Sequence, residues 1–185
     1  MNFIDEQIND VIDNNNRAQA QFENLLEGYS KETTEIVVNE PLYGVLDLSV
    51  LSRLGFLQVN KIVFGEGKLT NIENIPQKLP QIRLFHCTHN LLKNIENPPS
   101  TLEDLNLDGN ELAEIDLSVL DNLKILSLNH NRLTTLENFP ETLEELHVSS
   151  NQLTQLDFSS APLLKVVNIS DNNILRVENL PNSVS

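Results

Sequence analysis

Residues 123–136, LKILSLNHNRLTTL, contain the pattern that decides the fold of this chain. The same arrangement stands at 102–115 (LEDLNLDGNELAEI), 143–156 (LEELHVSSNQLTQL) and 164–177 (LKVVNISDNNILRV). In each copy, aliphatic residues occupy positions 1, 4, 6, 11 and 14, and asparagine occupies position 9. The asparagines recur every 20 or 21 residues. Such a fixed period indicates a chain built from stacked structural repeats.

Two less regular copies precede these, at residues 82–95 and 59–72. The earlier one places Gly67 where the asparagine stands elsewhere, 23 residues before Asn90. Residues 36–57 look like a degenerate first repeat.

Two alignments are open for Cys87, the only cysteine of the chain. The repeat pattern places it at a buried aliphatic position. Pro76, however, precedes Cys87 by eleven residues, as Pro99 precedes Asn110, and this count places Cys87 at the asparagine position. We expect a structural role in either place.

The spacing of the apolar residues is incompatible with amphipathic helices, because it breaks the 3.6-residue period. It fits a short strand at the centre of each repeat, with strands adding in parallel about 4.8 Å apart. Each repeat is too small to bury its apolar side alone, and stacking buries a continuous one. An inward asparagine is reasonable only if its amide bonds to backbone groups at the turn.

These repeats resemble the leucine-rich-repeat family, whose pattern LxxLxLxxNxLxxL they match over about three quarters of the chain. Residues 140–151 are similar to the short repeats of bacterial effectors, and residues 72–74 (IEN) to those of phosphatase regulators. The second Leu-Pro of most effector repeats and a ubiquitin-ligase domain are missing. Large-DNA-virus proteins use similar repeats too, so the source stays open. The resemblance implies a protein-binding function.

The predicted fold is an α/β solenoid, a horseshoe segment with short parallel strands on its concave face. The segments that return between strands are too short for full helices, and we expect irregular or 3-10 structure there. They alternate between a Glu-Asn-x-Pro type, such as 137–140, and an Asp-Leu-Ser or Asp-Phe-Ser type, such as 157–159. Residues 116–122 (DLSVLDN) are expected to form one helical turn.

An amphipathic helical segment precedes the repeats. Apolar residues from Ile4 to Leu25 recur at steps of four and three, which predicts a helix ending near Gly28. Asn14–Asn16 divides two interpretations: one long helix that mediates oligomerisation, or two short helices that cap the first repeat. We favour the cap, because the edge of a solenoid must be covered. The predicted domains are 1–34, 35–58 and 59–185.

The other end of the repeats differs. Residues 180–185 (LPNSVS) look like the opening of a further repeat. We expect the last strand either to be covered by a partner or to be followed by more repeats in a longer natural chain.

The charge of the chain limits its partners. Twenty-seven acidic and 12 basic residues give a formal net charge of −15. This charge disfavours nucleic acid and favours a protein partner with a basic surface. There is no signal-peptide pattern and no apolar run of membrane-spanning length, so we predict no membrane association and an intracellular location (cytoplasm, host cell or virion). No cofactor is predicted.

The candidate partner-binding residues are those that the register places on the concave face. They are Leu84, His86, His89, Asp104, Asn106, Asp108, Ile125, Ser127, His130, Glu145, His147, Val166 and Asn168. Leu84, Ile125 and Val166 alternate with acidic residues, and polar residues flank them, as at an interface with an apolar centre.

Two other patterns have a functional and a structural interpretation. The four histidines could bind a metal or sense pH, but the repeats separate them too far for one zinc ion, and we prefer ordinary contact residues. An acidic residue follows the last apolar position of every repeat. These seven could bind Ca²⁺ or a basic partner, but we prefer carboxylates that accept N–H groups of the return turns (Asp47, Glu73, Glu96, Asp116, Glu137, Asp157 and Glu178).

No enzyme signature is present in the sequence: there is no Gly-rich phosphate loop and no nucleophile with a base in a recognisable context. The leading hypothesis is a non-catalytic module that binds a protein through the concave face. The alternative is a structural subunit of a virion or multiprotein complex, held through the C-terminal edge and the N-terminal helix.

Overall fold

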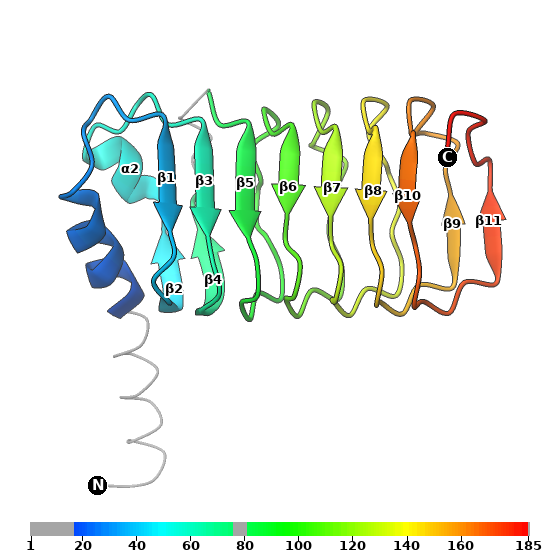
Figure 1. Cartoon of the computed structure of the whole chain (residues 1–185), viewed down its shortest axis with the longest axis horizontal. Helices are drawn as coiled ribbons and strands as arrows, with labels where there is room; N and C mark the ends of the chain where they lie inside the picture. Colours follow the sequence, from blue (N-terminus) through cyan, green and yellow to red (C-terminus); the bar gives the residue numbers. More distant parts are fainter. Residues whose placement is uncertain (1–16, 76–80, 185) are drawn as a thin grey trace, which may run out of the picture.

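The computed structural model describes residues 17–75 and 81–184. A helix at 17–26 precedes an elongated stack of short parallel strands (Figure 1). Seven strands form the main sheet, which lines the concave face of an α/β solenoid. In spatial order they are β1 (Glu35–Val38), β3 (Lys61–Phe64), β5 (Leu84–Cys87), β6 (Asp104–Asn106), β7 (Ile125–Ser127), β8 (Glu145–His147) and β10 (Val166–Asn168).

The strand register confirms the repeat alignment. Leu105 of β6 pairs with Leu126 of β7, and β8 continues the ladder in step. Cys87 pairs with Phe64 and is fully buried, so it occupies the aliphatic position, and Asn90 occupies the asparagine position. At Gly67, a Cβ atom would lie 2.9 Å from the Leu42 carbonyl oxygen, so the asparagine position accepts only glycine there.

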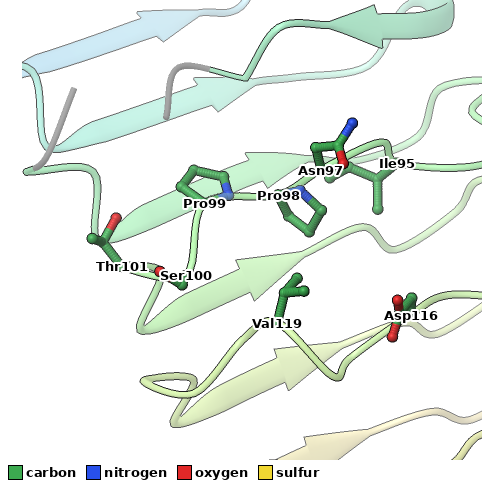
Figure 2. A pocket seen from close by; sticks show the side chains of 8 residues that line it. All are labelled: Ile95, Asn97, Pro98, Pro99, Ser100, Thr101, Asp116 and Val119. Carbon is green, nitrogen blue, oxygen red and sulfur yellow. The ribbon is translucent and has the colours of Figure 1, made fainter. Parts of the chain in front are cut away.

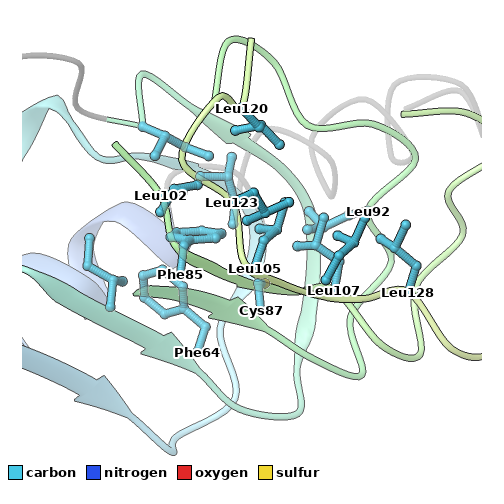
Figure 3. Packing of buried hydrophobic residues seen from close by; sticks show 14 of the residues in the cluster. Phe64, Phe85, Cys87, Leu92, Leu102, Leu105, Leu107, Leu120, Leu123 and Leu128 are labelled. Carbon is cyan, nitrogen blue, oxygen red and sulfur yellow. The ribbon is translucent and has the colours of Figure 1, made fainter. Parts of the chain in front are cut away.

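The core is a single apolar cluster that runs from Ala18 to Leu164. Each repeat adds aliphatic side chains that stack on those of its neighbours, as Figure 3 shows around Leu105, Leu107 and Leu123. Phe64 and Phe85 meet edge to face with their centroids 6.3 Å apart. Each fully buried leucine contributes about 1.5–3 kcal/mol, so stacking supplies the main stabilisation.

Five asparagines join each repeat to the one before it. Asn131 donates from Nδ2 to the carbonyl oxygens of Leu107 (3.0 Å) and Leu128 (3.1 Å), and its Oδ1 accepts the N–H of Leu112 (3.0 Å). Leu107 and Leu112 belong to the preceding repeat, whereas Leu128 belongs to its own. The other asparagines also bond across repeats, and we call the set the asparagine ladder (Asn90, Asn110, Asn131, Asn151 and Asn172).

The helix at 17–26 covers the outer side of the first repeat. Phe22 is fully buried and contacts Phe64 edge to face, with the ring centroids 5.5 Å apart. Just after the helix, the Tyr29 hydroxyl donates to the Val37 carbonyl (2.8 Å) and accepts the Val37 N–H (3.2 Å). The Tyr29 hydroxyl thus bonds both backbone polar groups of Val37 in β1, and the choice between a cap and an assembly helix stays a prediction.

Some predictions about the N-terminal segment are not tested by these contacts. Asn14–Asn16 and the choice between one helix and two lie outside the described residues. The division into domains at 1–34, 35–58 and 59–185 also stays a prediction.

The return side contains strands that the sequence did not predict. β2 (Tyr43–Asp47) pairs with β4 (Lys68–Glu73), and β9 (Gln155–Asp157) pairs with β11 (Arg176–Glu178), both in parallel. The first Asp-Leu-Ser return also leads into a short helix, α2 (Ser49–Arg53), which buries Val50 and Leu51.

At residues 116–122 the expected helical turn is not formed: two successive turns stand there, closed by the Leu120 N–H on the Leu117 carbonyl (3.0 Å) and the Leu123 N–H on the Leu120 carbonyl (3.0 Å). The return from Asp47 to Val59 is longer than the return from Asp116 to Leu123, and only the longer one contains a helix, α2.

Candidate functional site

Ten of the predicted site residues lie on β5–β10 in two parallel rows, in the strand order just given. The first residue of each strand forms the central row (Leu84, Asp104, Ile125, Glu145 and Val166). The third forms the flanking row (His86, Asn106, Ser127, His147 and Asn168). The residue between them points into the core, because strand side chains alternate.

The central row is only partly exposed. Leu84, Asp104, Ile125 and Glu145 are half-buried, and Val166 is 36% exposed. Its apolar and acidic side chains alternate from strand to strand.

Histidines lie beside the two central carboxylates. His86 Nε2 is 2.9 Å from Asp104 Oδ1, and His147 Nε2 is 3.7 Å from Glu145 Oε2. The two rows contain no lysine or arginine. Across these five strands the face therefore presents carboxylates, and the next residue of the same register, Lys61 of β3, pairs with Glu35 (3.0 Å).

Polar residues that follow the strands hydrogen-bond to one another and so stabilise the fold. Asp108 Oδ1 accepts the Ser127 hydroxyl (2.8 Å) and the Asn129 N–H (2.6 Å). Asn129 Oδ1 in turn accepts the N–H (2.8 Å) and hydroxyl (2.7 Å) of Ser149. Asp108 is thus part of a hydrogen-bonded chain that crosses three repeats.

His89 and His130 lie beyond the strands, in the turns before Asn90 and Asn131. Both are exposed and have positive φ angles, 53° and 54°. Gly109, the matching turn residue of the repeat between them, has φ 68°, and a Cβ atom there would lie 2.5 Å from His89 Nδ1. These histidines occupy left-handed turn positions at the rim, apart from the two rows.

Charged residues at the start of the strands neutralise one another. Glu103 contacts Arg83 (3.3 Å) and Lys124 (2.7 Å), and Lys165 pairs with Glu144. This hydrogen bonding and attraction lower the pKa values of Glu103 and Glu144. Cations beside the concave face are therefore engaged with acids of adjacent repeats.

The acidic residues of the return side divide by residue type. Asp47, Asp116 and Asp157 each accept the N–H of the serine two residues later, at 2.8–2.9 Å, as the structural interpretation predicts. Asn74 and Asn179 of the following repeats also donate to Asp47 (3.0 Å) and Asp157 (2.8 Å). The glutamates of the column show no such turn bond among the described residues.

These bonds change the titration of the aspartates. Burial alone would raise the pKa of Asp47, but its hydrogen bonds from Ser49 and Asn74 outweigh burial and lower it. The pKa of Asp116 is lowered by Ser118, and that of Asp157 by Asn179 and Ser159. The sequence did not predict the role of the asparagines. Asn74, Asn97, Asn138 and Asn179 all have positive φ, a conformation that asparagine tolerates.

No reactive centre appears in the described part of the chain. It holds no group of three or more His, Cys, Asp or Glu side chains arranged for a metal. Burial raises the pKa of the Cys87 thiol far above its ordinary value, so the thiol stays protonated. A depression of about 400 Å³ between two returns is lined by Pro98, Pro99 and Val119, with Asp116 at its margin (Figure 2). None of these residues pairs a nucleophile with a base.

Comparison with known families agrees with the geometry. A family model described as Leucine Rich Repeat matches residues 122–141. The repeat pattern and the solenoid fold are those of leucine-rich-repeat proteins. A comparison with curated proteins finds no match. The described helices include none long and apolar enough to cross a membrane.

Three solved structures are similar. The functional domain of InlJ from Listeria monocytogenes has a TM-score of 0.60 at 18% identity, covering 76% of this chain and 35% of that one. YopM from Yersinia pestis, a leucine-rich effector protein, has a TM-score of 0.57 at 28% identity, covering 69% of this chain and 42% of that one. A plant ice-binding protein has a TM-score of 0.54 at 21% identity, covering 82% of this chain and 55% of that one. The chain thus spans less than two thirds of the length of each.

We predict that Asp47→Asn, Asp116→Asn and Asp157→Asn together reduce the acid sensitivity of the fold. A carboxyl whose pKa is lower when folded stabilises the protein above its unfolded pKa, about 3.9, and this contribution disappears as pH falls. Asparagine keeps an acceptor for the turn N–H but does not titrate. The urea midpoint should therefore fall less between pH 5 and pH 3 in the variant than in the wild type.

The control is Glu96→Gln, Glu114→Gln and Glu137→Gln, which removes three exposed carboxylates without turn bonds. The urea midpoint of this control should fall between pH 5 and pH 3 by as much as that of the wild type. An equal loss of stability in the aspartate variant would contradict the assignment.

Proposed function

We propose that the chain is a non-catalytic module that binds a protein partner through its concave face. The observation that carries the proposal is that neighbouring polar groups are bonded within the fold, whereas the central row is left facing outward. Asp108 and its neighbours bond to one another, and the return-side aspartates hold turns. The central row, by contrast, presents half-exposed leucine, isoleucine and valine beside carboxylates. Apolar residues with a polar surround are typical of an interface centre.

The candidate contact residues remain those proposed from the sequence. The two rows form the centre, with His89, His130 and Asp108 at the rim. The net charge of −15 supports a partner with a basic surface. An intracellular location, in cytoplasm, host cell or virion, and the absence of nucleic-acid and membrane partners are parts of the same proposal.

The comparisons support an interaction role only in general terms. Leucine-rich repeats are typical of protein–protein interaction modules. One similar structure is named an effector and another an ice-binding protein, so the fold alone does not choose a partner. The rows of this chain must supply the specificity.

We predict that Ile125→Asp abolishes partner binding without unfolding the chain. It places a charge in the apolar centre of the interface, where a fully desolvated anchor contributes 2 kcal/mol or more, on the order of a thirtyfold change in affinity. Captured proteins from the source cells would be compared for wild type, Ile125→Asp and Val119→Asp, with circular dichroism of each variant. Val119 is 43% exposed on the return side and serves as the matched control. Retention of every partner by a folded Ile125→Asp chain would falsify the concave-face proposal.

A second candidate function is a subunit of a larger assembly, held through the edges of β10 and β11. The observation that favours it is apolar exposure there: Leu175 is 90%, Leu180 48% and Val177 39% exposed. In the described sheets β10 and β11 each pair on one side only, whereas side chains satisfy β1 on its outer edge. The candidate also includes the N-terminal helix, whose described part packs on the first repeat.

Light scattering tests the assembly candidate. The full chain should self-associate with rising concentration, and Val177→Lys should lower the mass, whereas Leu57→Lys, at a site 53% exposed near the other end, should not. A wild-type chain that stays monomeric at high concentration contradicts assembly of the chain with itself.

A further inference from the structure

The central row has a regular spacing that restricts what can lie on it. Its members occupy adjacent parallel strands, which are separated by about 4.8 Å. The apolar members therefore recur every two strands, about 9.6 Å apart, and the acids Asp104 and Glu145 stand midway between them at the same interval. An occupant that matches the row must present two kinds of side chain, alternately, along one line.

We propose that the occupant is an α-helix of a partner protein, lying across the strands, with apolar and basic residues alternating on one side. The inference rests on the proposed function and names its partner class. In a helix, residues seven apart lie on one side and about 10.5 Å apart, close to the 9.6 Å interval. Residues three or four apart, at about 4.5–6 Å, supply the intermediate positions.

Other backbone conformations do not fit both sets. An extended strand presents same-side residues about 6.6–6.8 Å apart, which matches neither interval. A polyproline helix repeats its side every three residues, about 9.3 Å, so it can follow the apolar set or the acidic set but not both. The alternation therefore favours the α-helix.

The charges on the face select basic residues on that helix. Asp104 and Glu145 lie in rows without lysine or arginine. A carboxylate has about four acceptor sites, so the contact of Asp104 with His86 at 2.9 Å leaves capacity for an incoming arginine or lysine. The polar flanking row would lie along one side of the helix and exclude apolar residues from it.

The test uses designed helical peptides as probes for the full chain. The matched peptide is alanine-based and fluorescently labelled, with three leucines seven residues apart and an arginine three residues after each of the first two. The offset peptide has the same composition, with the arginines moved to the opposite side of the helix. Fluorescence anisotropy should show the matched peptide binding at least about tenfold more tightly, a difference of about 1.4 kcal/mol.

Charge reversal locates the peptide. Asp104→Lys with Glu145→Lys should weaken the matched peptide at least about tenfold and should bind a peptide with glutamates in place of the arginines. The control, Glu114→Lys with Glu137→Lys, makes the same change of net charge at exposed residues outside the two rows and should bind nearly as the wild type does. Equal binding of matched and offset peptides, or equal weakening by both double variants, overturns the helix proposal.

The two proposals fail separately. If Ile125→Asp loses its cellular partners but no helical peptide shows the predicted preference, the concave face binds protein and the helix inference is wrong. If the matched peptide binds with the predicted dependence on Asp104 and Glu145 while Ile125→Asp keeps every cellular partner, the face accepts a helix but the proposed function is wrong.

Discussion

The hydrogen bonds of the asparagine side chains are the constraint on which the rest of this structure depends. In the five repeats that carry this asparagine, its side chain bonds to inward backbone N–H and C=O groups of its own and the preceding repeat. A buried group of this kind costs about 1–3 kcal/mol if it has no partner. One asparagine amide supplies two donors and an acceptor, and in Asn131 these reach Leu107 and Leu112 of the preceding repeat. A turn of one repeat is thus completed by the side chain of the next.

This coupling explains why the solenoid behaves as a stack in which each unit depends on its neighbour. The first repeat receives contacts from outside the pattern: Gln19 of the N-terminal helix accepts the Asp47 N–H, and Tyr29 bonds to β1. The same coupling keeps adjacent strands in register, so the central row continues from strand to strand at the spacing of a parallel sheet. The proposed partner helix is recognised by the spacing of the central-row side chains, which depends on that register. The asparagine ladder therefore contributes to the proposed binding surface without contacting the partner.

The repeats, the strand register and the two rows could be predicted from the sequence, because each depends on the local spacing of leucine and asparagine. The bonds between repeats could not. Asp108 and Asn129 appear in the sequence as equivalent polar surface residues, yet they bond to each other between adjacent repeats. The pairing of β9 with β11 likewise depends on contacts between segments about 20 residues apart. His89, Gly109 and His130 occupy equivalent turn positions, each with a positive φ angle. The spacing of residues in the sequence does not reveal that conformation.

Amide hydrogen exchange on the wild-type chain tests the central claim most directly. The N–H groups of Leu92, Leu112, Leu133 and Leu153 each bond to an asparagine of the following repeat. Ile174, the equivalent residue of the last described repeat, meets no such asparagine among the described residues. We predict that the four leucine amides exchange only through cooperative unfolding and that Ile174 exchanges much faster. If the leucine amides exchange as fast as Ile174, the ladder does not couple the repeats and this account of the fold is wrong.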